Sequence, residues 1–243
     1  MLIINADDWG RSRNETDLAR ECYSKGRITS VTAMVFMEDS KRAAQLASEE
    51  SVPAGLHLNL SEPFTGDSVP SDLTKSQERV ARFLQGGRYN SLFYNPCLRR
   101  DFRQVYRAQA DEFQRIYATR PTHIDGHHHL HLCSNVLLGN IIPCGERMRR
   151  NLSFWPGERH ILNRTWRKLS DRILRLRYSS TDYFFCLAGL LECQGFERVA
   201  GLARSAVVEL MVHPARAREH AWLMSERCPE AFGEIRKGSY ANF

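Results

Sequence analysis

The chain has 243 residues, of which 42% are hydrophobic and 26% charged, so its composition is that of an ordinary globular protein. No run of about 18 uncharged apolar residues occurs, which excludes a membrane-spanning helix. The net charge of +6 comes largely from arginines in the middle and last thirds of the chain. No zinc finger, RNA-binding signature or basic tail accompanies them. We therefore expect no nucleic-acid partner, and a solvated basic face or an anionic substrate is favoured.

Two features concern the cellular compartment. The first apolar run begins at Leu2, which leaves no room for a signal peptide, and we expect a cytoplasmic protein. The seven cysteines are odd in number and include no C-x-x-C pair, so reduced thiols are predicted rather than disulfides. Cys133 lies near a group of histidines and stays open as a minor alternative metal ligand.

Short apolar runs alternate with longer amphipathic stretches along the chain. This pattern predicts α/β units with parallel strands, and the length fits one domain over residues 1–243. The expected strands are Leu2–Ala6, Ser30–Phe36, Ala54–Leu60, Thr122–Gly126, Asn151–Trp155 and Ala206–His213. The expected helices are Thr16–Lys25, Ser40–Glu49, Phe102–Tyr117 and His160–Tyr178. Residues Ser61–Asn95, with several prolines and glycines, are expected to form a long loop at the active face of a barrel.

Carboxylates and imidazoles stand in or directly after four of the expected strands. Asp7 and Asp8 follow the first, His57 lies in the third, His127 follows the fourth and His213 ends the last. In a barrel of parallel strands, the carboxyl ends of the strands gather at one face and build the active site there. Aspartate and neutral imidazole together are the ligands of a hydrolytic divalent metal, so the pattern predicts a metal-dependent hydrolase.

The pair Asp7 and Asp8 has two interpretations. Neighbouring side chains in a strand point to opposite faces, so both can line one pocket only if the strand ends before them. The following Trp9-Gly10 favours such an end, because glycine permits a sharp turn. The alternative is that the pair caps the N-terminus of a helix.

The histidines also allow structural interpretations. His57 shares a strand face with Asn59, and alone it suits a hydrogen-bonded core histidine. His213 alone suits a polar residue that ends a strand. Four of the nine histidines, however, fall within Asp125–His131, and no structural need explains that density. Which of them binds metal, and which supply supporting hydrogen bonds, stays open at this point.

Together these residues resemble the YdjC-like carbohydrate deacetylases, a family with chito-oligosaccharide and hopanoid-biosynthesis members. The resemblance implies a distorted (β/α) TIM-like barrel and one divalent cation, Zn²⁺ or Mg²⁺, held by Asp8, His57 and His127. It implies Asp7 as general base and His213 as general acid. Trp9 stands where the family usually has phenylalanine, and Ala215 where it has glycine. The stretches that carry the resemblance are Asn5–Gly10, Thr29–Met34, Gly55–Leu60, Pro121–His131, Glu209–Pro214 and Gly238–Tyr240.

The resemblance further implies removal of an acetyl group from an N-acetylated amino sugar, either a free oligosaccharide or a lipid-linked glycan. We expect Trp9, Asn59 and Asp125 to contact that substrate. A metal-dependent phosphoesterase is the alternative enzyme, because the ligand types would be the same and arginines would bind phosphate. A non-catalytic nucleic-acid-binding protein is the alternative from another class, favoured only by the charge.

The expected helix His160–Tyr178 carries apolar residues at helical spacing and six basic residues between them. The simplest interpretation is a barrel helix with its apolar stripe on the core and a basic face in solvent. Peripheral contact with an anionic membrane is the alternative, since basic amphipathic helices bind such surfaces. A homodimer also stays open. The apolar residues of the stripe are Ile161, Leu162, Trp166, Leu169, Ile173 and Leu176.

Overall fold

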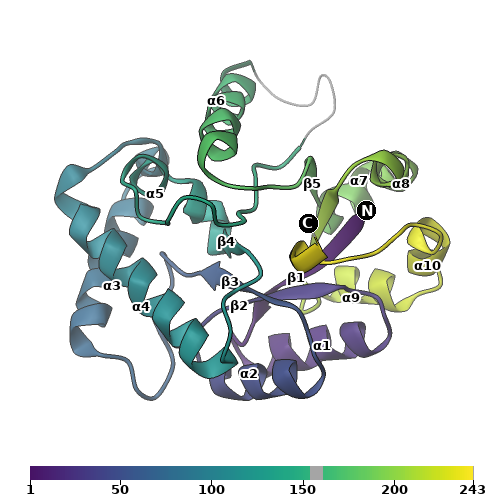
Figure 1. Ribbon diagram of the computed structural model, residues 1–243, viewed down its shortest axis with the longest axis horizontal. Helices are drawn as coiled ribbons and strands as arrows, with labels where there is room; N and C mark the ends of the chain where they lie inside the picture. Colours follow the sequence, from purple (N-terminus) through teal and green to yellow (C-terminus); the bar gives the residue numbers. More distant parts are fainter. Residues whose placement is uncertain (154–160, 243) are drawn as a thin grey trace.

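The computed structural model describes residues 1–153 and 161–242, and Figure 1 shows a curved sheet with helices around it. All six strands are parallel and belong to one sheet, with the order β4-β3-β2-β1-β6-β5. This is a curled half-barrel, which confirms the expected α/β class with parallel strands. The strands are β1 (Leu2–Trp9), β2 (Ser30–Ala33), β3 (Ala54–Leu58), β4 (Ile124–Gly126), β5 (Tyr183–Cys186) and β6 (Val208–Val212).

The first strand of the chain lies in the middle of the sheet. β1 pairs with β6 through Ile4 and Leu210, and with β2 through Asn5 and Ser30. Every residue of β1 is buried, as expected for a parallel strand covered on both faces. Its carboxyl end therefore places Asp7 and Asp8 at the centre of the half-barrel.

An irregular segment lies in the seam between the edge strands β4 and β5. Met148 forms a parallel bridge with Ile124 of β4, and the Ser153 amide donates to the Phe184 carbonyl of β5 at 2.7 Å. The expected strand Asn151–Trp155 was wrong in part: residues 151–153 form no strand, and its last two residues lie outside the described ones. The strand that fills this position in the sheet is β5, which we did not predict.

Ten α-helices and four 3₁₀ turns are described around the sheet. The expected loop Ser61–Asn95 was wrong in its middle part, because residues 71–85 form a helix, α3, whose Leu73, Val80 and Leu84 are buried. The α-helices are α1 (Arg13–Ser24), α2 (Ser40–Glu49), α3 (Ser71–Gln85), α4 (Arg99–Tyr117), α5 (Ser134–Leu138), α6 (Ile161–Arg177), α7 (Leu187–Cys193), α8 (Phe196–Ser205), α9 (Ala217–Met224) and α10 (Arg227–Phe232). The 3₁₀ turns are η1 (Asn90–Leu92), η2 (Pro96–Leu98), η3 (His127–Leu132) and η4 (Tyr240–Asn242).

The helix α6 does not bury the described part of the apolar stripe that its sequence predicts. Leu169 and Leu176 are 52% and 78% exposed, whereas Leu174, outside that stripe, is fully buried. Ile173 is half-buried, and the side chains of residues 161–166 are not among those described. None of the described helices is long and apolar enough to cross a bilayer.

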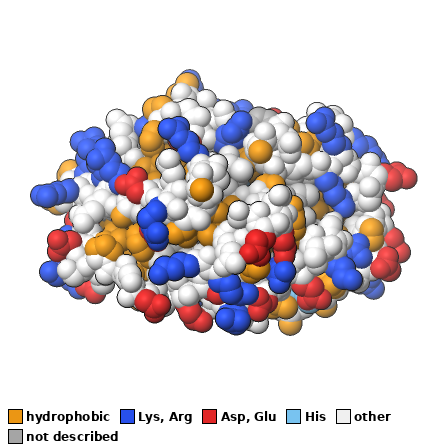
Figure 2. All heavy atoms as spheres, turned by 60° about the horizontal axis from the view of Figure 1, so that its bottom comes forward, with side chains coloured by type: hydrophobic (Ala, Val, Ile, Leu, Met, Phe, Trp, Pro, Cys, Tyr) orange, Lys and Arg blue, Asp and Glu red, His pale blue; other side chains and the backbone are white. Residues whose placement is uncertain are grey.

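The basic residues do not form one continuous track on the face shown in Figure 2. Lys and Arg side chains are interspersed there with Asp and Glu, and apolar side chains form a band across the middle. The surface charge on this face is therefore mixed, although the chain as a whole carries +6.

Candidate active site

A β-bulge brings the two neighbouring carboxylates to the same site. The strand β1 runs through both residues to Trp9, but its register with β2 shifts after Ala6. Asp8 has φ +67°, a left-handed conformation that costs a non-glycine residue on the order of 1 kcal/mol. The expected strand end before Asp7 was therefore wrong. A bulge within the strand, rather than its end, allows both side chains to reach one site. The helix-cap alternative fails too, because the N-cap of α1 is Ser12.

Asp8, His57 and His127 form a compact set of three ligand atoms. Asp8 Oδ1 lies 3.0 Å from His127 Nδ1 and 3.3 Å from His57 Nε2, and the two ring nitrogens are 3.4 Å apart. Two ligands of a tetrahedral ion, each about 2.1 Å from it, lie roughly 3.4 Å apart. The three residues are buried and come from three different strand ends. Their donor types and spacing fit one divalent cation.

A second carboxylate fixes the far nitrogen of each imidazole. His57 Nδ1 lies 2.7 Å from Asp125 Oδ1, and His127 Nε2 lies 3.0 Å from Glu62 Oε1. Each ring can thus hold a proton on the side of its carboxylate and direct its other nitrogen toward Asp8. Such carboxylate–histidine pairs orient the ligands of metal sites and raise their basicity.

The turn η3 is bent so that His127 faces this set. His128 and His129 both have left-handed conformations, with φ of +54° and +58°. Gly126, before the turn, lies so near His131 that a Cβ would approach its side chain and backbone to 3.0 Å. A glycine at this position therefore permits the chain to fold back on itself.

The electrostatics of the set favour charged groups despite their burial. Burial favours the neutral form of Asp8, but hydrogen bonds from His127 and His57 outweigh it and hold the pKa of this carboxyl well below its usual range. Burial also opposes the charged form of His57, yet Asp125 and Asp8 raise the pKa of its imidazole well above 6.5. A cation bound here would compete with this proton, so its binding would release protons.

Asp7 lies beside the set and is bound by a buried arginine. Arg149, in the seam segment, is fully buried and donates from both terminal nitrogens to the two oxygens of Asp7, at 2.7 Å each. It also contacts Asp125 at 2.6 Å and Glu209 at 2.8 Å. Burial would raise the pKa of Asp7, but the Arg149 guanidinium holds that pKa well below its usual range. Asp7 is therefore ionised at neutral pH.

His213 follows β6 at the same end of the sheet as Asp7 and Asp8. Its side chain is 15% exposed, and its backbone amide donates to Glu219 at 2.7 Å. Burial lowers the pKa of the imidazole, while the nearby charges of Asp7 and Asp8 partly raise it. It is not part of the three-ligand set.

None of the other histidines of this turn belongs to the set with Asp8, although His128 forms a second possible ligand group with Glu62 and His127. His131 is fully buried and donates from Nε2 to the Arg149 carbonyl at 3.1 Å, whereas His129 lies edge-on to Phe184 at 5.7 Å. His128 is exposed and contacts Ser61. Burial raises the pKa of the Cys133 thiol to about 12, which makes it a poor ligand. All seven cysteines are free, as predicted.

The three residues expected to contact substrate are buried. Trp9 is 0% exposed and donates from its indole nitrogen to the Ala43 carbonyl. Asn59 is equally buried and fixes the following loop through the Glu62 backbone. The oxygens of Asp125 contact His57 and Arg149. All three side chains are thus engaged by neighbouring groups of the site, and their contact with a substrate stays a prediction.

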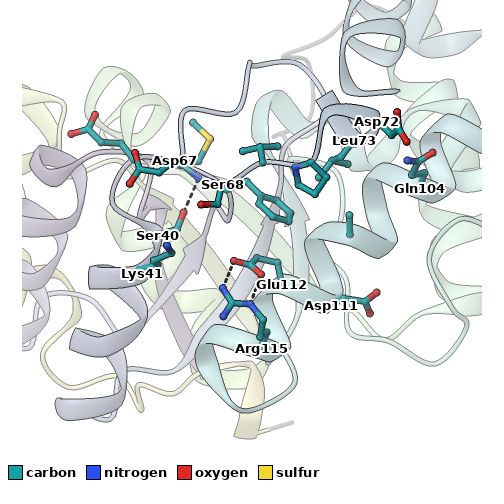
Figure 3. Close-up of a pocket in the computed structure, with 17 residues that line it drawn as sticks. Ser40, Lys41, Asp67, Ser68, Asp72, Leu73, Gln104, Asp111, Glu112 and Arg115 are labelled. Atoms are coloured by element: carbon teal, nitrogen blue, oxygen red, sulfur yellow. Dashed lines mark hydrogen bonds and ion pairs between the residues drawn. The ribbon is translucent and has the colours of Figure 1, made fainter. Parts of the chain in front are cut away.

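A cavity of about 520 Å³ lies outside this site (Figure 3). It is bounded by α2, α4 and residues 66–73, and its floor includes Phe36, Val69 and Leu73. Arg115 pairs with Glu112 at its edge, at 2.6 Å. Its lining includes none of the metal-ligand candidates, so its volume is no measure of the catalytic pocket.

Comparison with known proteins identifies the family. The family model described as YdjC-like protein matches residues 1–234. The chain belongs to the YdjC-like family. It is 33% identical over 137 residues to a chitooligosaccharide deacetylase of Proteus mirabilis, a match covering 56% of this chain and 52% of that protein. It is 30% identical over 136 residues to a carbohydrate deacetylase of Mus musculus, with 56% and 44% covered. These matches span about half the length of the relatives.

A solved structure supports the same fold. A protein of Enterococcus faecalis V583, named for cellobiose-phosphate cleavage, superimposes with a TM-score of 0.68 over 99% of this chain and 97% of that one. The sequence identity is 21%, so this likeness concerns the fold alone. Family and fold both agree with what the motifs predicted.

Sequence reasoning missed Arg149, Glu209 and Glu62 as parts of the site. Arg149 sits in an unremarkable basic stretch with no motif around it. One signal was available: Glu209 interrupts the apolar strand β6, and a carboxylate buried in a strand needs a cation or proton nearby. Glu62 gave no signal, since it lies in a polar loop.

Proposed function

We propose that the protein is a metal-dependent hydrolase that removes the acetyl group from an N-acetylated amino sugar. The observation that carries the proposal is the set of Asp8, His57 and His127, with ligand atoms 3.0–3.4 Å apart, beside the ionised carboxylate of Asp7. The names of the family relatives, chitooligosaccharide and carbohydrate deacetylase, support this substrate class. The chain matches about half the length of these relatives.

Asp8, His57 and His127 would hold the cation, Zn²⁺ or Mg²⁺. When bound, such an ion supplies Lewis acidity, which polarises a carbonyl and makes water more acidic. Mixed imidazole and carboxylate ligands suit Zn²⁺, while Mg²⁺ prefers oxygen. The donor set therefore favours Zn²⁺ between the two.

Asp7 would accept the proton of the attacking water. Its Oδ1 receives hydrogen bonds from Asn5 and Arg149, while the described contact of Oδ2 is Arg149 alone. Oδ2 thus keeps a lone pair for the proton, and Arg149 fixes its direction. Because Arg149 keeps Asp7 ionised, the base form is present throughout the neutral range.

His213 would donate the proton that the leaving nitrogen needs. An amine departs poorly from a tetrahedral carbon unless it is protonated as the C–N bond breaks. His213 follows β6, the parallel neighbour of β1, and its imidazole is influenced by the charges of Asp7 and Asp8 and stays partly accessible. The products would be acetate and a free amino sugar, carried either as an oligosaccharide or on a lipid.

The alternative functions find less support. A phosphoesterase needs cations that face its substrate, yet Arg149 is fully buried and engaged by Asp7, Asp125 and Glu209. Arg11, which lies near Asp8, pairs with Glu62 at 2.9 Å. A nucleic-acid-binding protein would not need the paired carboxylate behind each imidazole.

A product screen tests the proposal. The purified protein, loaded with Zn²⁺ or Mg²⁺, is incubated with N-acetylated sugars, free and lipid-linked, and with sugar phosphates as the counter-series. We expect acetate from at least one N-acetylated sugar and no phosphate from the counter-series. Phosphate release without acetate would instead establish the phosphoesterase.

A further inference from the structure

The exposed large apolar side chains gather on one part of the surface. Among the side chains that the structure describes, seven are of this kind, and all belong to residues 89–94, α5 and α6. The helix α5 links the other two segments: Ser134 donates to the Leu92 carbonyl at 2.7 Å, and Arg177 donates to the Leu137 carbonyl at 2.7 Å. Figure 1 shows α5 beside α6. This apolar face consists of Tyr89, Leu92, Phe93, Tyr94, Leu138, Leu169 and Leu176.

On α6, leucines and arginines share the outward side of the helix. Leu169, Arg172 and Leu176 follow at spacings of three and four residues, which places them in one row. Arg172 and Arg175 are exposed beside Leu176, which is itself 78% exposed. The carboxylate of this helix, Asp171, pairs with Arg150 at 2.6 Å. The row therefore offers apolar and positive groups together.

The loop segment has the same character. Between Gly86 and Arg100 the sequence contains no aspartate or glutamate, and Arg88, Arg99 and Arg100 are exposed. The guanidinium of Arg88 lies over the Tyr89 ring, 5.5 Å from its centre. Tyrosine together with basic residues is typical of surfaces that lie in the headgroup region of a bilayer.

We infer that the apolar face docks on an anionic phospholipid bilayer. The arginines complement the headgroups, and the leucines and aromatic rings enter the boundary below them. A second copy of the chain fits less well, because a two-fold interface would bring Arg172 and Arg175 of both copies together. The helix α5 follows η3, which carries His127, so docking would hold the catalytic site near the lipid surface. The inference does not depend on the deacetylase activity.

Co-sedimentation of the full chain with vesicles tests it. We expect binding to vesicles of phosphatidylcholine with phosphatidylglycerol, weaker binding in high salt, and little to phosphatidylcholine alone. Arg172→Glu with Arg175→Glu should lower the partition at least about tenfold, at roughly a factor of five per charge. Phe93→Ser with Leu176→Ser should lower it as well.

The matched control carries Arg13→Glu with Lys25→Glu, two exposed charges of α1 and its C-terminal cap outside the apolar face. It should bind like the parent. Thermal unfolding of each variant checks that it is folded. Absence of binding to anionic vesicles, or equal losses in the α6 and control variants, would overturn the inference. So would self-association of the parent that Phe93→Ser with Leu176→Ser abolishes while vesicle binding persists unchanged.

Discussion

Arg149 donates to both carboxylate oxygens of Asp7, at 2.7 Å each, although the two residues lie 142 positions apart in the chain. The arginine comes from the seam between the edge strands, and the aspartate from the central strand. Since this contact fixes the ionisation and direction of the carboxylate next to three metal-ligand candidates, the closure of the half-barrel also assembles the proposed base.

The two neighbouring aspartates should separate by role. Asp7→Asn should keep the metal and lower kcat by about 10²–10⁴-fold, because a general base is lost while the ligand set stays. Asp8→Asn should lose metal. Metal content and acetate release are measured on both purified variants, and equal metal loss in the two would contradict this division.

The histidine ligands should be His57 and His127. Replacing either with Ala should abolish metal retention, since the remaining two ligands hold a divalent ion poorly against water. His220→Ala is the control, because His220 lies in α9, pairs with Glu21 and belongs to none of the possible ligand groups of the described residues. It should retain metal. Retention in His127→Ala together with loss in His131→Ala would show that the assignment within the cluster is wrong.

His213 should act on the leaving group. His213→Ala should keep metal affinity and lower kcat for a sugar acetamide, but not for an activated amide whose amine leaves unprotonated. Burial lowers the pKa of His213 below 6.5, so the donating imidazolium gains population as pH falls through that lowered value. The kcat of the parent should show this pH dependence, and the kcat of the variant should lack it. An equal loss on both substrates would assign His213 another role.

Glu209 should make the folded protein less stable as pH rises. Burial, only partly offset by Arg149, raises the pKa of this carboxyl from 4.5 to about 7, so between these values the folded state binds a proton that the unfolded state does not. The free energy of unfolding should then fall across this window by at most about 3 kcal/mol. Denaturant unfolding of the metal-free protein measures it. Glu209→Gln should remove this contribution, and an unchanged slope would refute the cause.

The sequence predicted the parts of the site that have local patterns. The histidine density near residue 127 and the paired carboxylates after an apolar run are visible in a few neighbouring residues. The burial of Trp9 and Asn59 was not visible, because polar and aromatic side chains at strand ends can face either a pocket or the core. Arg149 depends on contacts with three distant strands, which no local pattern encodes.

The predicted burial of the apolar side of α6 was wrong for a related reason. The spacing of Leu169 and Leu176 predicts an amphipathic helix correctly, but periodicity does not tell which surface covers the apolar side. The helix α3 was not predicted because prolines and glycines of the loops on either side of it dominate this stretch of the sequence.

The central claim is that Asp8, His57 and His127 hold the cation on which deacetylation depends. Its most direct test is a titration of chelated protein with Zn²⁺ and with Mg²⁺, in which bound metal and acetate release are measured on the same sample. We predict that activity rises with bound metal and saturates at one ion per chain, and that Asp8→Asn neither binds nor responds. Full acetate release from the metal-free protein, or restored activity in Asp8→Asn, would contradict the account.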